Sequence, residues 1–236
     1  MGQHGEHGRV VRAAALAVAA LAPAAARALD CSVALVLALD VSASVDASEY
    51  ALQMGGLAAA FRDEAVIETI LSPEGSGIMA SAFMWSGFHH QEVAIDWTWL
   101  GDRAAIAAFA DALAVAPRGR RDLPTALGRA MAFGAEMLRR APGDCARKVM
   151  DVSGDGVNND GVEPDWYRSR GWFDGITING LVIRGATPDP EPYFRAQVLH
   201  GPGAFLEVAR FYTDYPEAIL RKLLRELQPA AAMMTE

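Results

Sequence analysis

An unbroken apolar run, Val33–Leu39, ends abruptly at an acidic residue, Asp40. Consecutive apolar side chains with no polar alternation are typical of a strand that is covered on both faces, as in the middle of a parallel sheet. Parallel strands are joined by crossover connections, which place helices on the two faces of the sheet. The run therefore predicts an α/β chain and argues against an all-β or an all-helical one.

The rest of the chain alternates between strand and helix patterns. A helical pattern opens at Ser48 and Glu49, and we expect Ser48 to be its N-cap. Further patterns follow in chain order: a hairpin of strands at 78–85 and 92–97, helices at 102–115 and 123–140, strands at 148–152, 177–183 and 205–209, and a last helix at 215–227. This order predicts a doubly wound, mostly parallel central sheet with an antiparallel edge hairpin and helices on both faces, a Rossmann-like three-layer sandwich.

The N-terminal segment has the pattern of an export signal. Two arginines, Arg9 and Arg12, precede a short apolar run at 13–22, and Ala26-Arg27-Ala28 follows as a cleavage site. The apolar run is about half of the roughly 20 residues that a membrane-spanning helix needs. We therefore predict a signal peptide at 1–28, one domain at 29–228 and a flexible tail at 229–236, in a periplasmic or secreted protein without stable membrane insertion after cleavage. The alternative is a buried N-terminal helix.

The charge balance narrows the class of partner. The chain has 29 acidic against 21 basic residues and a formal charge of −8. Binding to nucleic acid needs a basic face, so we expect no nucleic-acid partner. With 52% apolar residues, the chain has enough apolar side chains for a packed core.

Oxygen-bearing side chains follow the predicted strands at the places where such a fold binds ligands. Asp40, Ser42 and Ser44 follow the first strand, Thr125 opens a helix, and Asp155 follows the strand at 148–152. In open α/β sheets, ligands bind outside the carboxyl ends of the strands. Two carboxylates and three hydroxyls form a hard donor set, which favours Mg²⁺ or Mn²⁺, allows Ca²⁺ and disfavours zinc.

This pattern is shared by a known kind of metal site. Three segments together resemble the metal-ion-dependent adhesion site (MIDAS) of von Willebrand factor type A (VWA) domains: Asp40-x-Ser42-x-Ser44, Thr125-x-x-Gly128-x-Ala130-Met131 and Asp155-Gly156. The resemblance covers most of the chain after the export signal, in order and spacing. It is nearest to an uncharacterised group of secreted bacterial proteins of the VWA type.

The resemblance implies a role for each of these residues. Ser42, Ser44 and Thr125 would ligate a cation directly, with Mg²⁺ as the cofactor and Mn²⁺ or Ca²⁺ as alternatives. Asp40 and Asp155 would act mostly through water, and an acidic side chain of a protein partner would fill an open coordination position. The chain would then be a metal-dependent protein-binding module and not an enzyme. It departs from the family pattern in one place, with Leu-Pro-Thr where relatives often have Gly-Gly-Thr.

Two alternative functions stay open. The string Gly154–Asn159 also resembles a segment of haloacid-dehalogenase-like phosphotransferases, in which Asp40 would be the aspartyl nucleophile. That chemistry needs a second acid at the position of Ser42 and a lysine at the phosphate, whereas Lys148 and Lys222 are expected elsewhere. The other alternative is a degenerate VWA domain with a structural role and a vestigial metal site.

A shared metal site has a consequence for the two cysteines. Cys31 lies about as far before Asp40 as Cys145 lies before Asp155. If both aspartates sit at one site on adjacent parallel strands, both sulfurs lie together at the opposite end of those strands. We therefore predict a Cys31–Cys145 disulfide, which an oxidising compartment would preserve. The alternative is two separate buried thiols.

Overall fold

A computed structural model describes residues 1–2, 31–72, 76–120 and 122–228. Within these residues, strands form a six-stranded sheet in the order β3-β2-β1-β4-β5-β6. Their bounds are β1 (Cys31–Asp40), β2 (Ile78–Trp85), β3 (Gln91–Leu100), β4 (Cys145–Gly154), β5 (Thr177–Ile183) and β6 (Leu206–Ala209). The β2–β3 pair is antiparallel and lies at an edge, and the other neighbours pair in parallel. The predicted sheet with its edge hairpin is confirmed.

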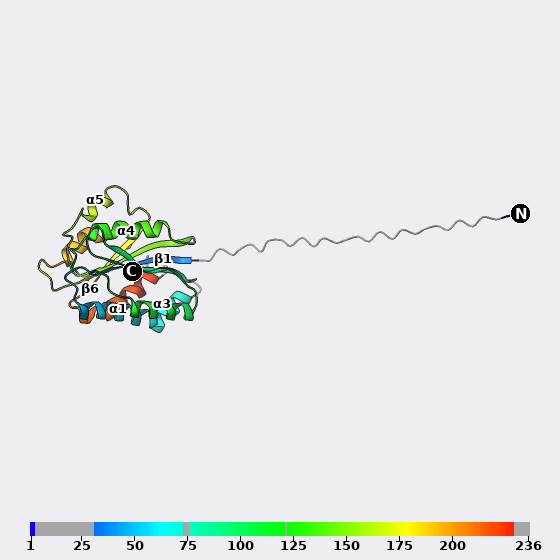
Figure 1. Ribbon diagram of the computed structural model, residues 1–236, viewed down its shortest axis with the longest axis horizontal. Coiled ribbons are helices and arrows are strands. Elements are labelled where there is room, and N and C mark those ends of the chain that lie inside the picture. The colour runs from blue at the N-terminus through cyan, green and yellow to red at the C-terminus, as the bar shows by residue number, and fades with distance from the viewer. Residues whose placement is uncertain (3–30, 73–75, 121, 229–236) are drawn as a thin grey trace.

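Helices cover both faces of the sheet, as Figure 1 shows with α4 and α5 on one side and α1 and α3 on the other. One layer contains α1 (Ala47–Arg62), α2 (Glu64–Leu71), α3 (Arg103–Val115) and α7 (Tyr215–Leu227), with the 3-10 turn η2 (Tyr212–Asp214) before α7. The other contains α4 (Leu127–Arg139), α5 (Pro164–Arg168), α6 (Glu191–Tyr193) and the π-helical turn η1 (Phe194–Val198). None of the described helices combines the length and the apolar character needed to cross a membrane. The predicted signal peptide, apart from residues 1–2, and the predicted tail lie outside the described residues.

Strand β1 explains why the first apolar run shows no alternation. Its odd-numbered side chains, such as Leu35 and Leu37, pack in the core beneath α1, α3 and α7. Its even-numbered side chains, such as Ala34 and Val36, pack in the core beneath α4. All four are fully buried, because both faces of the central strand are covered.

Two local expectations were wrong, and one helix was missed. The N-cap of α1 is Asp46 and not Ser48: the Asp46 carboxylate accepts from the backbone N–H of Ser48 and Glu49, and the Glu49 carboxylate accepts from the Asp46 N–H. This reciprocal capping box satisfies free donors at the helix start, so the helix begins earlier. The helix expected at 123–140 begins only at Leu127, because tertiary hydrogen bonds hold the preceding residues in a loop. Helix α2 was not predicted, because its eight residues are too few for a clear helical period.

The structure contains the predicted disulfide. Cys31 and Cys145 are paired directly in the parallel register of β1 and β4, and their Cα atoms are 4.4 Å apart. Both cysteines start their strands, whereas Asp40 ends β1 and Asp155 follows β4. The covalent link therefore joins the two strands at the end opposite to the aspartates.

A charge cluster is buried between α7 and the sheet. Lys222 Nζ lies 2.8 Å from Asp151 Oδ2 and 2.5 Å from Glu226 Oε1. Asn179 Nδ2 on β5 donates to Glu226 Oε1 at 2.9 Å, and Arg147 Nη2 donates to the Glu226 carbonyl at 3.0 Å. Burial is the main cause that raises the pKa of Glu226 to about 7; the charge of Lys222 opposes this rise, and the charge of Asp151 adds to it. Two carboxylates thus share one buried ammonium.

We expect this cluster to make the folded state less stable as the pH rises. A Glu226 carboxyl with a raised pKa binds its proton more tightly in the folded than in the unfolded chain, so its contribution is fully present below about pH 4.5 and is lost as the pH passes 7. Glu226→Gln keeps an acceptor for Lys222 and Asn179 but does not titrate. Urea unfolding measures the change. From pH 5 to pH 8, the free energy of unfolding of the wild type should fall by roughly 1–3 kcal/mol more than that of Glu226→Gln. Parallel profiles for the two proteins would contradict this assignment.

Candidate metal centre

The carboxyl ends of β1 and β4 bring the two predicted aspartates together. Leu39 pairs with Ser153 in the parallel register, so Asp40 and Asp155 leave neighbouring strands at the same edge of the sheet. A Cβ placed on Gly154 would lie 3.0 Å from Asp40 Oδ2. Gly154 thus leaves the space that the Asp40 carboxylate occupies.

The loop after β1 connects its two serines with both aspartates. Asp40 Oδ1 accepts a hydrogen bond from the Ser42 backbone N–H at 2.7 Å. Ser42 Oγ lies 3.2 Å from Ser44 Oγ, and Ser44 Oγ donates to Asp155 Oδ1 at 2.7 Å. Four of the five predicted site residues therefore form one continuous hydrogen-bonded set.

The loop before α4 brings Thr125 to the same edge. The Leu123 carbonyl accepts from the Ala43 N–H at 2.9 Å, which ties this loop to the one after β1. A Cβ placed on Gly156 would lie 3.6 Å from Thr125 Oγ1, so the Thr125 hydroxyl faces the residue that follows Asp155. Thr125 is 5% exposed. The Leu-Pro-Thr sequence thus still delivers the threonine beside the second aspartate.

The electrostatics of the site suit a cation. Asp40 is fully buried and Asp155 is 8% exposed. Burial and the nearby charge of Asp155 together raise the pKa of Asp40 to about 7, against the hydrogen bonds from Ser42, which lower it. Among the described residues, Asp40 Oδ2 has no hydrogen-bond partner. An unpartnered carboxylate oxygen beside three hydroxyls fits the oxygen preference of Mg²⁺ or Ca²⁺.

Carboxylates and imidazoles alone do not form this site. In the described part of the chain, no cluster of three or more His, Cys, Asp or Glu residues could hold a metal ion. A cation at this edge would therefore need the serine and threonine hydroxyls to complete its set of ligands.

Three further residues support the site, and sequence reasoning missed all of them. Tyr212 Oη donates to Asp155 Oδ2 at 3.1 Å, from the turn before α7. Arg118 Nη2 donates to the Ser42 carbonyl at 3.1 Å and also to the Val45 carbonyl. Gln53 Nε2 in α1 donates to the Asp40 carbonyl at 3.3 Å. No sequence signal identifies them, because only the tertiary fold brings each of them to the site.

Two asparagines fix the loop that contains Thr125. Asn159 Oδ1 accepts from the Thr125 N–H at 2.7 Å, and the Asn159 N–H donates to the Thr125 carbonyl at 2.9 Å. Asn158 Oδ1 accepts from the Gly128 N–H at 3.2 Å, in the first turn of α4. Both belong to the Asp155-Gly156-Val157-Asn158-Asn159 string, so the sequence did contain a signal for them.

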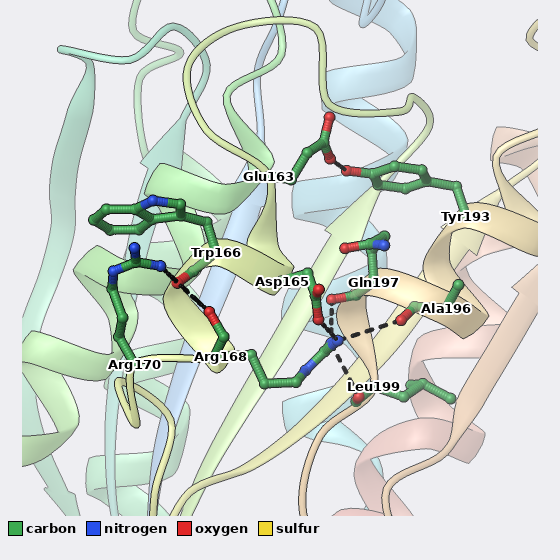
Figure 2. Close-up of polar contacts among 10 residues, drawn as sticks. Glu163, Asp165, Trp166, Arg168, Arg170, Tyr193, Ala196, Gln197 and Leu199 are labelled. Carbon is green, nitrogen blue, oxygen red and sulfur yellow. Dashed lines mark hydrogen bonds and ion pairs between the residues drawn. The ribbon is translucent and has the colours of Figure 1, made fainter.

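The segment after Asp155 is anchored again where it enters α5, as Figure 2 shows. The Tyr193 hydroxyl donates to the Glu163 carboxylate. Arg168 Nη2 donates to the carbonyls of Gln197 at 2.6 Å and Leu199 at 3.4 Å. These contacts join α5 to the α6–η1 turn and hold the far end of the loop that presents Asp155.

Comparison with solved structures identifies the fold. The chain is similar to proximal thread matrix protein 1 from the mussel byssus "with zinc occupied MIDAS motif" (13% identity, TM-score 0.59, 85% of this chain and 48% of that one). It is also similar to a von Willebrand factor type A protein from Catenulispora acidiphila (17% identity, TM-score 0.59, 84% of this chain and 43% of that one). A third match is the pilus adhesin SpaC from Lactobacillus rhamnosus GG (16% identity, TM-score 0.57, 84% of this chain and 30% of that one). The chain thus spans less than half the length of each of these proteins, and at these identities the likeness concerns the fold.

Comparison with models of sequence families shows which family the chain belongs to. No curated protein matched the chain. The model of the family described as "Protein of unknown function (DUF1194)" matches residues 30–231, which include all five predicted site residues and both cysteines. The chain therefore belongs to the DUF1194 family and has the fold of von Willebrand factor type A domains.

Proposed function

We propose that this chain is an exported domain that binds a divalent cation and uses it to hold an acidic side chain of a protein partner. Ser42, Ser44 and Thr125 would ligate the cation, and Asp40 and Asp155 would act mostly through water. The observation that carries the proposal is the meeting of all five side chains at one edge of the sheet, with Asp40 Oδ2 unpartnered among the described residues. The VWA fold supports it.

The ligand set explains why such a site would hold a partner. When bound, the cation supplies a positive charge that attracts an external carboxylate. Because neutral hydroxyls would provide the direct contacts, the two aspartates would not neutralise the cation by binding it directly. Arg118, whose guanidinium is engaged with backbone carbonyls, keeps the loop after β1 in place. The residues of this chain would thus hold the cation in place, and a carboxylate of the partner would complete its coordination.

Calorimetric titration of the purified protein with Mg²⁺, Mn²⁺, Ca²⁺ and Zn²⁺ tests the proposal. We expect saturable binding of one ion, with Mg²⁺ or Mn²⁺ preferred over Ca²⁺. Zinc belongs in the series because a protein with this fold has zinc in its MIDAS motif. No binding of any ion at millimolar concentration would contradict the proposal and favour the degenerate, structural alternative.

Tyr212→Phe should weaken the cation site without unfolding the domain. The substitution removes only the hydroxyl that donates to Asp155 Oδ2, and the ring keeps its buried place. Loss of a group that orients a ligand typically reduces metal affinity about 10- to 100-fold, and we expect the lower end here because Ser44 still donates to Oδ1. Calorimetry measures the affinity, with Tyr50→Phe as a control, since Tyr50 Oη bonds to the Ala116 carbonyl. An unchanged affinity in Tyr212→Phe would show that the hydroxyl has no such role.

We also propose that the domain works outside the cytoplasm. Its two cysteines are joined as a disulfide, which persists in oxidising compartments. The export pattern at 1–28 points the same way, and a pilus adhesin is among the proteins that share the fold. N-terminal sequencing of the protein recovered from its native source tests this: we expect a start at residue 29, and a start at Met1 would contradict it.

The position of the lysines does not favour the phosphotransferase alternative. Lys222 is buried and ion-paired with Asp151 and Glu226. Lys148 pairs in register with Ala34, well before the end of β1 where Asp40 lies. Phosphatase turnover in Mg²⁺ that vanished in Asp40→Asn would nevertheless establish that alternative.

A further inference from the structure

A cleft of ≈ 570 Å³ opens beside the candidate metal centre. Its apolar lining comes from three loops at the same edge of the sheet: Phe88 from the β2–β3 turn, Leu123 and Pro124 from the loop before α4, and Val162 from the loop after β4. Val162 is 37% exposed. The cleft thus offers an accessible apolar surface on the face where a partner would meet the cation.

The cleft and the metal centre share backbone. Pro124 in the wall of the cleft directly precedes Thr125, and the Thr125 carbonyl accepts from the Asp160 N–H at 3.2 Å. The next residue, Ala126, donates its N–H to the Ser86 carbonyl at 2.8 Å, at the start of the β2–β3 turn. The backbone that forms the wall of the cleft therefore leads directly into the threonine that would ligate the cation.

The polar groups of the cleft favour an acidic ligand over a basic one. The carboxylate of Asp160 already accepts from the Phe88 N–H at 2.8 Å. Arg120 is 65% exposed, and its contact with Asp122, itself 75% exposed, is a long 3.6 Å. Apolar walls with the exposed guanidinium of Arg120 at the rim suit an apolar side chain from a segment that carries negative charge.

We propose that the partner segment pairs an acidic residue, held by the cation, with a bulky apolar residue one or two positions away that fills this cleft. The inference rests on the proposed function, since the acidic residue would be the one that completes the coordination. An extended peptide advances about 3.3 Å per residue, and the wall of the cleft begins at the neighbour of Thr125. An apolar side chain one or two residues from the acid is therefore at the right distance to enter.

A random heptapeptide library, selected on the purified protein in Mg²⁺ and eluted with chelator, tests this proposal. We expect sequences with Asp or Glu and a Leu, Ile, Phe or Trp one or two positions away. For a selected peptide, Val162→Asp should lower affinity roughly tenfold or more, because it replaces an apolar contact by a like charge. Val93→Asp, which adds the same charge at an equally exposed valine (40%) on β3, should have little effect. Both variants should bind Mg²⁺ like the wild type.

The outcomes separate the cleft from the metal site. Enrichment of acidic residues without an apolar neighbour, or equal effects of the two valine variants, would overturn the role of the cleft and leave the proposed function standing. A protein that binds Mg²⁺ but enriches no peptide in a chelator-sensitive way would overturn both.

Discussion

Asp40→Asn should lower the affinity for Mg²⁺ at least about 100-fold while the domain stays folded. The amide keeps an acceptor for the Ser42 N–H, so the loop after β1 retains its geometry. It removes a fully buried negative charge from the site, and even at an effective dielectric constant of 20 a unit charge about 4 Å from a cation is worth roughly 4 kcal/mol. Calorimetry at pH 8 measures the affinity, and Asp96→Asn, on the exposed part of β3, is the charge-matched control.

The same variant should be at least as stable as the wild type when metal is absent. Asp40 is buried near the charge of Asp155, and both effects raise its pKa, which means that the ionised carboxylate destabilises the metal-free fold. Replacing it by a neutral amide removes that penalty. Thermal unfolding in chelator at pH 8 should therefore give a Tm equal to or above that of the wild type, and added Mg²⁺ should raise the Tm of the wild type alone. A folded variant that keeps the wild-type Mg²⁺ affinity, or a variant whose Tm in chelator falls well below that of the wild type, would contradict this account of Asp40.

Removing the disulfide should destabilise the domain by about 4–5 kcal/mol. The bond closes a loop between residues 114 apart in sequence, and in the chain-entropy model a loop of this size restricts the unfolded chain by about that amount. Because domains have about 5–15 kcal/mol of stability in total, the loss is a large share of it. Urea unfolding of the Cys31→Ser/Cys145→Ser double variant against the oxidised wild type measures the difference.

Two controls make the disulfide result specific. Cys31→Ser alone should be destabilised about as much as the double variant, because either change breaks the same link. The reduced wild type should match both. The prediction would be contradicted if the free energies of unfolding of the oxidised and the reduced protein differed by less than about 1 kcal/mol. Two free thiols in the exported protein, found by mass spectrometry, would also contradict it.

The sequence predicts most of the sheet, because its strands are defined by local patterns. β1 contains a continuous apolar run and β5 ends in one, Leu181–Ile183, and each strand lies in the sheet within a residue or two of its expected bounds. The resemblance to a shared metal site implies that β1 lies beside β4, and with that premise the spacing of Cys31 and Cys145 from the two aspartates predicts the disulfide. The start of α4 was mispredicted, because hydrogen bonds from residues far along the chain, and not local propensity, decide where that helix begins.

The sequence predicts the ligands of the candidate site, but it does not predict the residues that hold those ligands in place. Asp40, Ser42 and Ser44 follow a recognisable strand, so their pattern is visible in the sequence. Tyr212 and Arg118 reach the same loops from the turn before α7 and from the segment after α3. Only the fold brings these side chains to the site, and a single sequence has no local pattern that marks them.

The most direct test of the central claim is a crystal structure of the protein soaked with Mn²⁺, in which anomalous scattering locates the ion. The proposed function predicts one strong peak at the carboxyl edge of β1 and β4, within about 2.5 Å of the hydroxyl oxygens of Ser42, Ser44 and Thr125. A peak at another place, or no peak at this edge with millimolar Mn²⁺, would contradict it.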